Sequence, residues 1–126
     1  MILDTTFLID LQREFKKRRN GPAREFLNER AGTRFRISVI TATEFLEGFE
    51  TTAKGERFIR NLPWTPVDDA IARQAAVFRR SLRVAGQLIG DFDLLIGSTA
   101  VVLQLPLVTN NEAHFRRLDG LKVISY

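Results

Sequence analysis

Two carboxylates stand at the start of the most apolar stretch of this chain. Asp91 and Asp93 open the sequence DFDLLIGSTAVVL, and no charged residue occurs between Leu94 and Leu105. Burying an unpaired carboxylate is costly, so a buried acid is normally protonated, paired with a cation or bound to a metal ion. Asp93 is therefore a candidate for chemistry. Asp91 also fits a simpler role as the N-cap of a helix, so we assign it only a supporting role in the site.

Three other segments carry acids or amides that a parallel sheet would bring to the same place. Asp4 closes the apolar run MIL, Glu44 comes shortly after the alternating run FRISVI, and Asn110 and Asn111 follow PLVT directly. The ligands of open α/β sheets collect beyond the carboxyl ends of the strands. We therefore predict that Asp4, Glu44 and Asp93 form one site at this edge of the sheet.

Each acid also has a purely structural interpretation. Asp4 could cap a helix that begins near Thr5, and Glu44 could complete a capping box with Thr41. Asp93 would be stabilised by the positive end of a helix dipole. Together these interpretations require several independent caps to fall on the same edge of one sheet, so we favour a shared site.

The donor atoms of this predicted site are oxygens. The chain has no cysteine and one histidine, His114, which we interpret as a surface residue of the last loop. Oxygen ligands suit a hard cation better than they suit zinc. The sequence therefore predicts a Mg²⁺ site, with Mn²⁺ as the alternative ion.

The hydrophobic pattern predicts the elements that position these side chains. Short apolar runs at 1–3, 35–40, 106–109 and 121–126 are typical of strands. Helices are predicted from Pro22, from the Thr41 capping box, from Asp68 to Gly86 and from Asp91, whereas 51–64 is predicted to be a helical turn and a loop. The fold class is therefore α/β, a single domain over 1–126 with a mostly parallel central β-sheet flanked by helices on both faces.

Composition and charge narrow the class of protein. With 126 residues, 44% hydrophobic and 27% charged, the chain fits one globular domain. It shows no signal peptide and no apolar run long enough to cross a bilayer, so we predict a cytoplasmic protein with no membrane partner. The net charge of +4, carried mostly by arginine, is compatible with RNA binding. The densest basic cluster is either a solvated helix end or an RNA-binding surface: Arg13, Lys16, Lys17, Arg18 and Arg19.

Four motifs give the chain a family resemblance. The sequences ILDTTFLIDL, ISVITATEFLEG, GQLIGDFDLLIGSTA and LPLVTNNEAHFRRLDGLKVISY follow one another over almost its whole length. They resemble PIN domains, and more closely the VapC toxins of bacterial toxin–antitoxin pairs. The resemblance implies a Mg²⁺-dependent ribonuclease site at Asp4, Glu44 and Asp93, with tRNA or rRNA as the substrate. It also implies inhibition by a cognate VapB-like antitoxin and, usually, a homodimer.

Three positions depart from the family's pattern. Thr6 stands where asparagine is usual, although its hydroxyl can still orient Asp4 or hold a water. Asn111 stands where an acid often follows the strand that ends at Thr109, and close relatives often carry an acid at the position of His114. Because Asn111 is neutral, a single-metal or water-mediated site and a two-metal site both remain open. Thr6, Thr109 and Asn111 are assigned supporting roles.

These features together predict a Mg²⁺-dependent endoribonuclease that hydrolyses structured RNA, with a tRNA as the favoured target. A single histidine cannot supply the acid–base pair that ribonucleases forming a cyclic phosphate commonly use.

One alternative is a PIN-like module that binds RNA or a partner without cutting, which the residues Thr6 and Asn111 support. A phosphoacceptor receiver domain is disfavoured, because Asp4 has no acidic neighbour and the only late lysine, Lys122, lies within the last strand.

Overall fold

The positions of the helices and strands come from a computed structural model that describes the whole chain, Met1–Tyr126. Along the sequence its five strands are separated by seven helices, two between successive strands and one between the last two. The strands are β1 (Ile2–Leu3), β2 (Ile37–Ser38), β3 (Trp64–Thr65), β4 (Leu107–Val108) and β5 (Val123–Ile124). The helices are α1 (Thr5–Lys16), α2 (Pro22–Glu29), α3 (Val39–Glu47), α4 (Thr52–Ile59), α5 (Asp69–Val84), α6 (Asp91–Leu103) and α7 (Glu112–Phe115).

All strand pairings are parallel, which confirms the predicted sheet. Strand β4 lies between β1 and β5, and β2 pairs with β3. A parallel bridge between Ile2 and Arg36 joins β1 to the residue before β2, so the strand order is β3-β2-β1-β4-β5. The carboxyl ends of β1, β2 and β4 therefore meet at one edge, as the site prediction requires.

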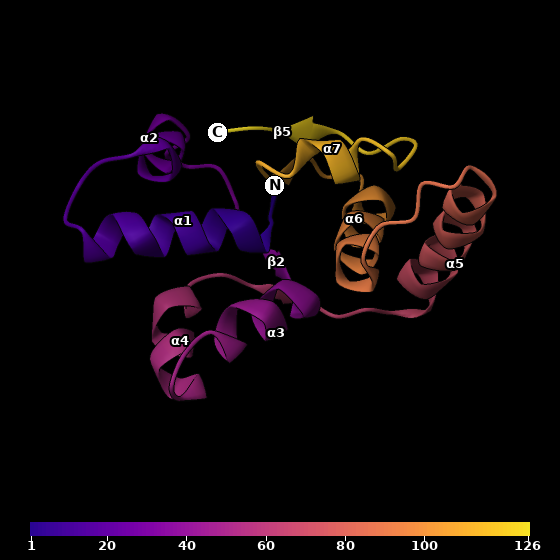
Figure 1. Cartoon of the computed structure of the whole chain (residues 1–126). Coiled ribbons are helices and arrows are strands. Elements are labelled where there is room, and N and C mark those ends of the chain that lie inside the picture. The colour runs from indigo at the N-terminus through magenta and orange to yellow at the C-terminus, as the bar shows by residue number, and fades with distance from the viewer.

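Alternate residues of the strands supply two separate apolar cores. Ile2 and Leu107 pack with α5, α6 and α7, whereas Leu3 and Val108 pack with α1, α2, α3 and α4. Successive strand residues point to opposite faces, so a strand that is covered on both faces is apolar throughout. Figure 1 shows α1 to α4 on one side of the strands and α5 and α6 on the other. The prediction of helices on both faces is confirmed.

The start of α3 differs from the prediction. The run FRISVI is a strand only at Ile37–Ser38, and the helix already begins at Val39. Ser38 is the N-cap, and its hydroxyl accepts a hydrogen bond from the backbone N–H of Ile40 at 3.1 Å. The capping box of Thr41 and Glu44 is therefore wrong, because an earlier hydroxyl already caps the helix.

The segment 51–64 is more ordered than predicted. It forms the eight-residue helix α4, and Trp64 then begins the edge strand β3, which the hydrophobic pattern did not identify. Pro63 and Pro66 flank this strand, and proline normally argues against strand structure. At an edge this objection disappears, because the Pro63 carbonyl accepts a hydrogen bond from Ile37 at 3.0 Å and no N–H is needed in return.

Other helix boundaries agree with the sequence. Pro22 occupies the first turn of α2, and the Asp68 carboxylate caps α5 by accepting from the N–H of Ile71 at 3.0 Å. Gly86, with a φ of +67°, follows the end of α5, where the left-handed backbone favours glycine. None of the helices combines the length and the apolar character that crossing a bilayer requires.

Candidate active site

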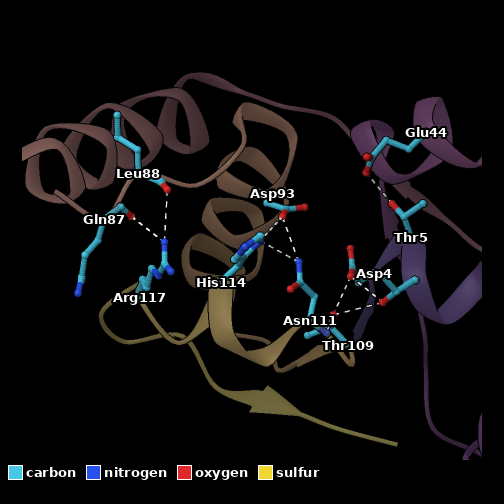
Figure 2. Close-up of polar contacts among 11 residues, drawn as sticks. Asp4, Thr5, Glu44, Gln87, Leu88, Asp93, Thr109, Asn111, His114 and Arg117 are labelled. Carbon is cyan, nitrogen blue, oxygen red and sulfur yellow. Dashed lines mark hydrogen bonds and ion pairs between the residues drawn. The ribbon is translucent and has the colours of Figure 1, made fainter.

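Asp4 lies at the carboxyl end of β1 and is almost completely buried, at 2% exposure. One of its oxygens, Oδ2, accepts hydrogen bonds from the hydroxyls of Thr6 at 2.9 Å and Thr109 at 2.7 Å. Asp4 occupies the N-cap position of α1, but its carboxylate makes no capping bond. In Figure 2 its other oxygen points away from Thr109, toward the space bordered by Glu44 and Asp93. The structure thus supports the orienting role predicted for Thr6, and it shows the same contact for Thr109, which was predicted only to support the site.

Glu44 reaches the same space from α3. It lies in the second turn of the helix and not in the first, because α3 begins at Val39. Its Oε1 accepts a hydrogen bond from the hydroxyl of Thr5 at 2.7 Å, a contact that joins α3 to the first turn of α1. Consecutive hydroxyls at the start of α1, Thr5 and Thr6, therefore hold two of the predicted carboxylates.

Asp93 borders this space from the first turn of α6. Its Oδ2 accepts a hydrogen bond from the side-chain amide of Asn111 at 3.2 Å and lies 3.3 Å from Nδ1 of His114. Figure 2 shows the second oxygen of Asp93 directed to the other side, toward Asp4 and Glu44. The structure thus brings Asp4, Glu44 and Asp93 around one opening at the sheet edge.

Asp91 lies outside this group. Its side chain is 69% exposed and pairs with Arg79 of α5. The N-cap of α6 is Gly90, so the interpretation of Asp91 as a side-chain cap is wrong. Asp91 is the first residue inside the helix, where a carboxylate still interacts favourably with the helix dipole. The two aspartates of the opening sequence therefore have different surroundings.

The electrostatics of the site disfavour several negative charges at once. Burial raises the pKa of Asp4, the charge of Asp93 raises it further, and the hydrogen bonds from Thr109 and Thr6 oppose this increase. Burial also raises the pKa of Glu44, the hydrogen bond from Thr5 opposes the increase, and the charges of Asp4 and Asp93 add to it. Carboxylates that repel one another in a partly buried space favour the binding of a cation between them.

The donor chemistry fits a hard cation held partly through water. The site presents carboxylate oxygens with hydroxyls behind them, which are the ligand types that Mg²⁺ and Mn²⁺ prefer. The chain contains no group of three or more His, Cys, Asp or Glu side chains already close enough to enclose an ion. Mg²⁺ usually keeps several waters and binds through one or two carboxylates, so such a group is not required.

Comparison with known proteins identifies the family of this chain. A sequence model of the PIN domain family matches residues 1–121. The chain is also 36% identical to Ribonuclease VapC1 of Methanocaldococcus jannaschii, over 98% of this chain and 85% of the relative. The chain belongs to the PIN domain family, in its VapC group. The resemblance seen in the motifs and the α/β fold class are therefore confirmed.

Two further comparisons place this PIN domain among toxin–antitoxin proteins. It is 32% identical to the tRNA(fMet)-specific endonuclease VapC of Shigella flexneri, over 82% of this chain and 85% of the relative. Its structure matches a chain of the DNA-bound VapBC complex of Salmonella typhimurium with a TM-score of 0.81 and 27% identity, over 98% of this chain and 96% of that one.

The predicted basic cluster is only partly connected to the carboxylates of this PIN domain. Arg13 lines a surface pocket together with Thr6 and Asn111, and it also lines a neighbouring pocket of about 290 Å³ with Lys17 and Arg19. These three cations therefore line pockets that begin beside Thr6 and Asn111, the residues that contact Asp4 and Asp93. The two other members of the cluster are exposed but line neither pocket: Lys16 and Arg18.

His114 is the residue that the sequence interpretation missed. It was expected on the surface of a loop, but it lies on α7 within 3.3 Å of Asp93, with its side chain 45% exposed. An imidazole nitrogen therefore lies beside one of the carboxylates, which the sequence interpretation did not anticipate. Asn111 and His114 are three residues apart, and this spacing places side chains on the same face of a helix. That spacing was the available signal.

Proposed function

We propose that this VapC-like PIN domain is a Mg²⁺-dependent endoribonuclease that hydrolyses structured RNA, with a tRNA as its target. The supporting observation is the convergence of Asp4, Glu44 and Asp93 from three separate elements on one opening at the sheet edge. The relatives named above support the reaction class, and the name of the Shigella flexneri protein supports a tRNA.

The three carboxylates would hold the cation in this proposal. A cation bound there would polarise the scissile phosphate and lower the pKa of a bound water. The residues of the chain supply the rest. Thr6 and Thr109 fix one oxygen of Asp4, which leaves the other oxygen directed at the site, and Thr5 fixes Glu44 in the same way. Arg13, Lys17 and Arg19 would contact the flanking phosphates of the RNA, a contribution that weakens with salt.

The chemical form of the RNA ends tests the reaction class. Attack by water on phosphorus, with departure of the 3′ oxygen, leaves a 5′-phosphate and a 3′-hydroxyl. We expect these ends on the fragments produced from a tRNA pool, because His114 is the only histidine and cannot by itself supply the acid–base pair that ribonucleases forming a cyclic phosphate commonly use. Ligation and phosphatase assays on purified fragments distinguish these ends from a 2′,3′-cyclic phosphate. Cyclic-phosphate ends would contradict the proposal.

The main alternative is a PIN-like module that binds RNA without cutting it. Thr6 and Asn111 were its support, since both replace residues that are usual in the family. The hydrogen bond from Thr6 to Asp4 weakens this support, because the hydroxyl fills the orienting role. Titration of Mg²⁺ in the presence of RNA separates the two functions: a binding module would retain RNA without producing fragments.

We also propose that a VapB-like antitoxin covers the surface formed by α1, α3 and α4, and that its tail extends from there to the carboxylates. Phe15 is 50% exposed and contacts Phe58 edge to face, and Phe49 and Phe58 line a surface pocket with Lys54 and Arg57. This surface offers aromatic side chains to an apolar segment. An arginine of the antitoxin tail would pair with Asp4 or Asp93 in place of the cation. A homodimer of the toxin remains a prediction.

Phe15→Ser should weaken binding of the co-expressed antitoxin by about tenfold or more, because an aromatic anchor is lost. RNA cleavage by the free toxin should not change, since Phe15 lies outside the carboxylate group. Val84→Ser is a suitable control, because Val84 is 90% exposed on α5, on the other side of the sheet. Titration calorimetry measures both variants. An antitoxin that binds Phe15→Ser normally but loses affinity for Val84→Ser would place the interface on the opposite side.

A further inference from the structure

Three side chains meet on the side of Asp93 that faces away from Asp4. Oδ2 of Asp93 lies 3.2 Å from Nδ2 of Asn111 and 3.3 Å from Nδ1 of His114, and these two nitrogens are 3.1 Å apart. Figure 2 shows Asn111 and His114 converging on one oxygen of Asp93, while the other oxygen faces Asp4 and Glu44. The three polar atoms form a nearly equilateral triangle.

Hydrogen bonding alone cannot satisfy all three edges of this triangle. If Nδ1 of His114 carries a proton, it can donate to Asp93, but it then faces the Asn111 amide as a second donor. If Nδ1 is unprotonated, it can accept from Asn111, but its lone pair then faces the Asp93 carboxylate. Either tautomer therefore leaves one close contact between like groups.

A cation removes this conflict. Ligands at neighbouring corners of an octahedral ion, each about 2.1 Å from the metal, are about 3.0 Å apart. The three separations in the triangle are close to this value. Rotating the Asn111 amide by half a turn exchanges its oxygen and nitrogen, which occupy nearly the same space. The triangle then presents two oxygens and one imidazole nitrogen to a common point.

We propose that Asp93, Asn111 and His114 form one face of a second cation site, on the side of Asp93 opposite Asp4 and Glu44, in which Nδ1 of His114 is a ligand, and that this nitrogen makes the second site prefer Mn²⁺ to Mg²⁺. The inference deepens the proposed function, because it rests on Asp93 being a metal-binding carboxylate there. Imidazole suits transition metals, whereas Mg²⁺ prefers oxygen ligands. A site with an imidazole ligand would thus differ in ion preference from a site built only of carboxylates.

The single histidine makes the test direct. Untagged protein with two equivalents of Mn²⁺ is examined by electron spin echo spectroscopy, in which a ligating imidazole gives a characteristic ¹⁴N modulation. Any such signal must come from His114, because the chain has no other histidine. We expect the modulation in the wild type and its loss in His114→Gln. Its absence in the wild type, or its persistence in the variant, would overturn the inference.

Binding measurements give a second readout that does not depend on RNA cleavage. His114→Gln should weaken Mn²⁺ binding by about tenfold or more, and Mg²⁺ binding by less than about threefold. Glu112→Gln is the matched control, because Glu112 lies on the same helix and pairs with Arg116. It should leave both affinities unchanged. Equal losses for both ions in His114→Gln would overturn the preference for Mn²⁺.

The outcomes also separate this inference from the proposed function. An imidazole signal in a protein that cuts no RNA would support the ligand assignment and contradict the nuclease. Metal-dependent cleavage without an imidazole signal would support the nuclease and overturn the role of His114.

Discussion

Asp93→Asn is expected to reduce RNA cleavage by about a thousandfold or more while the protein remains folded. The substitution keeps the size of the side chain but removes the charge that would bind the cation, and a metal ion contributes several kcal/mol to such a reaction. The amide oxygen that replaces the carboxylate oxygen could still accept a hydrogen bond from Asn111. A single-turnover assay on labelled RNA measures the loss, and circular dichroism checks the fold.

Asp91→Asn provides the matched control for this variant. It makes the same chemical change two residues away on the same helix, but at a side chain that is 69% exposed and paired with Arg79. An exposed ion pair contributes at most about 1 kcal/mol to stability, so cleavage should stay within about threefold of the wild type. If Asp91→Asn is inactive and Asp93→Asn is active, the roles of the two aspartates are reversed. If both cut normally, the metal site lies elsewhere.

The two remaining carboxylates should also be essential, and they offer a test through stability. Asp4→Asn and Glu44→Gln should abolish cleavage because each removes one anionic ligand. In both groups the pKa is raised by folding, so the native state binds protons more tightly than the unfolded chain. Without metal, the free energy of unfolding should therefore be larger at acidic pH and fall as the pH rises through these raised values.

The variants should lessen this pH dependence and be more stable than the wild type at neutral pH without metal. An amide relieves the repulsion among the carboxylates, and it can still accept the threonine hydrogen bonds. Chemical denaturation at several pH values in the presence of EDTA measures the effect. A wild-type protein whose stability rises from pH 5 to pH 8 more steeply than that of Asp4→Asn would contradict this electrostatic account.

The sheet and the convergence of the carboxylates could be predicted because both depend on the order of apolar strands and amphipathic helices, which the hydrophobic pattern of the sequence shows. Apolar strands such as Ile2–Leu3 and Leu107–Val108 are covered on both faces, and this requires helices on both sides. Parallel strands then place Asp4 and Thr109 side by side at their carboxyl ends, whatever the details of the loops. Topology alone therefore brings Asp4 and Thr109 together at this edge of the sheet.

What could not be predicted depends on local competition and on side-chain direction. Ser38 and Thr41 are both good caps, and only the position at which the strand ends decides between them. Trp64 forms a strand because it lies at the edge of the sheet. There the sheet does not need the N–H groups that the neighbouring prolines lack. His114 sits on a helix of four residues, which is too short for a full periodic pattern, so only its spacing of three residues from Asn111 indicated the direction of its side chain.

Removal of divalent metal should abolish cleavage without unfolding the protein. The fold rests on two apolar clusters of 11 buried residues each, and neither includes a carboxylate of the site. EDTA should therefore stop RNA cleavage completely and leave the circular dichroism spectrum unchanged. Mg²⁺ or Mn²⁺ added in excess should restore activity, and EDTA already saturated with Mg²⁺ should not inhibit. Zn²⁺ should restore little, because one imidazole does not provide the nitrogen or sulfur set that zinc prefers.

Thermal unfolding separates a metal that binds at the carboxylates from one that only accompanies the RNA. A cation that binds the native state stabilises it according to its concentration and affinity, so Mg²⁺ should raise the melting temperature in the absence of RNA. The increase should persist in Asp91→Asn and disappear in Asp93→Asn, since only the second variant removes a carboxylate that faces Asp4 and Glu44. Undiminished cleavage in chelator, or an equal thermal shift in both variants, would exclude catalysis by a cation held at this edge of the sheet.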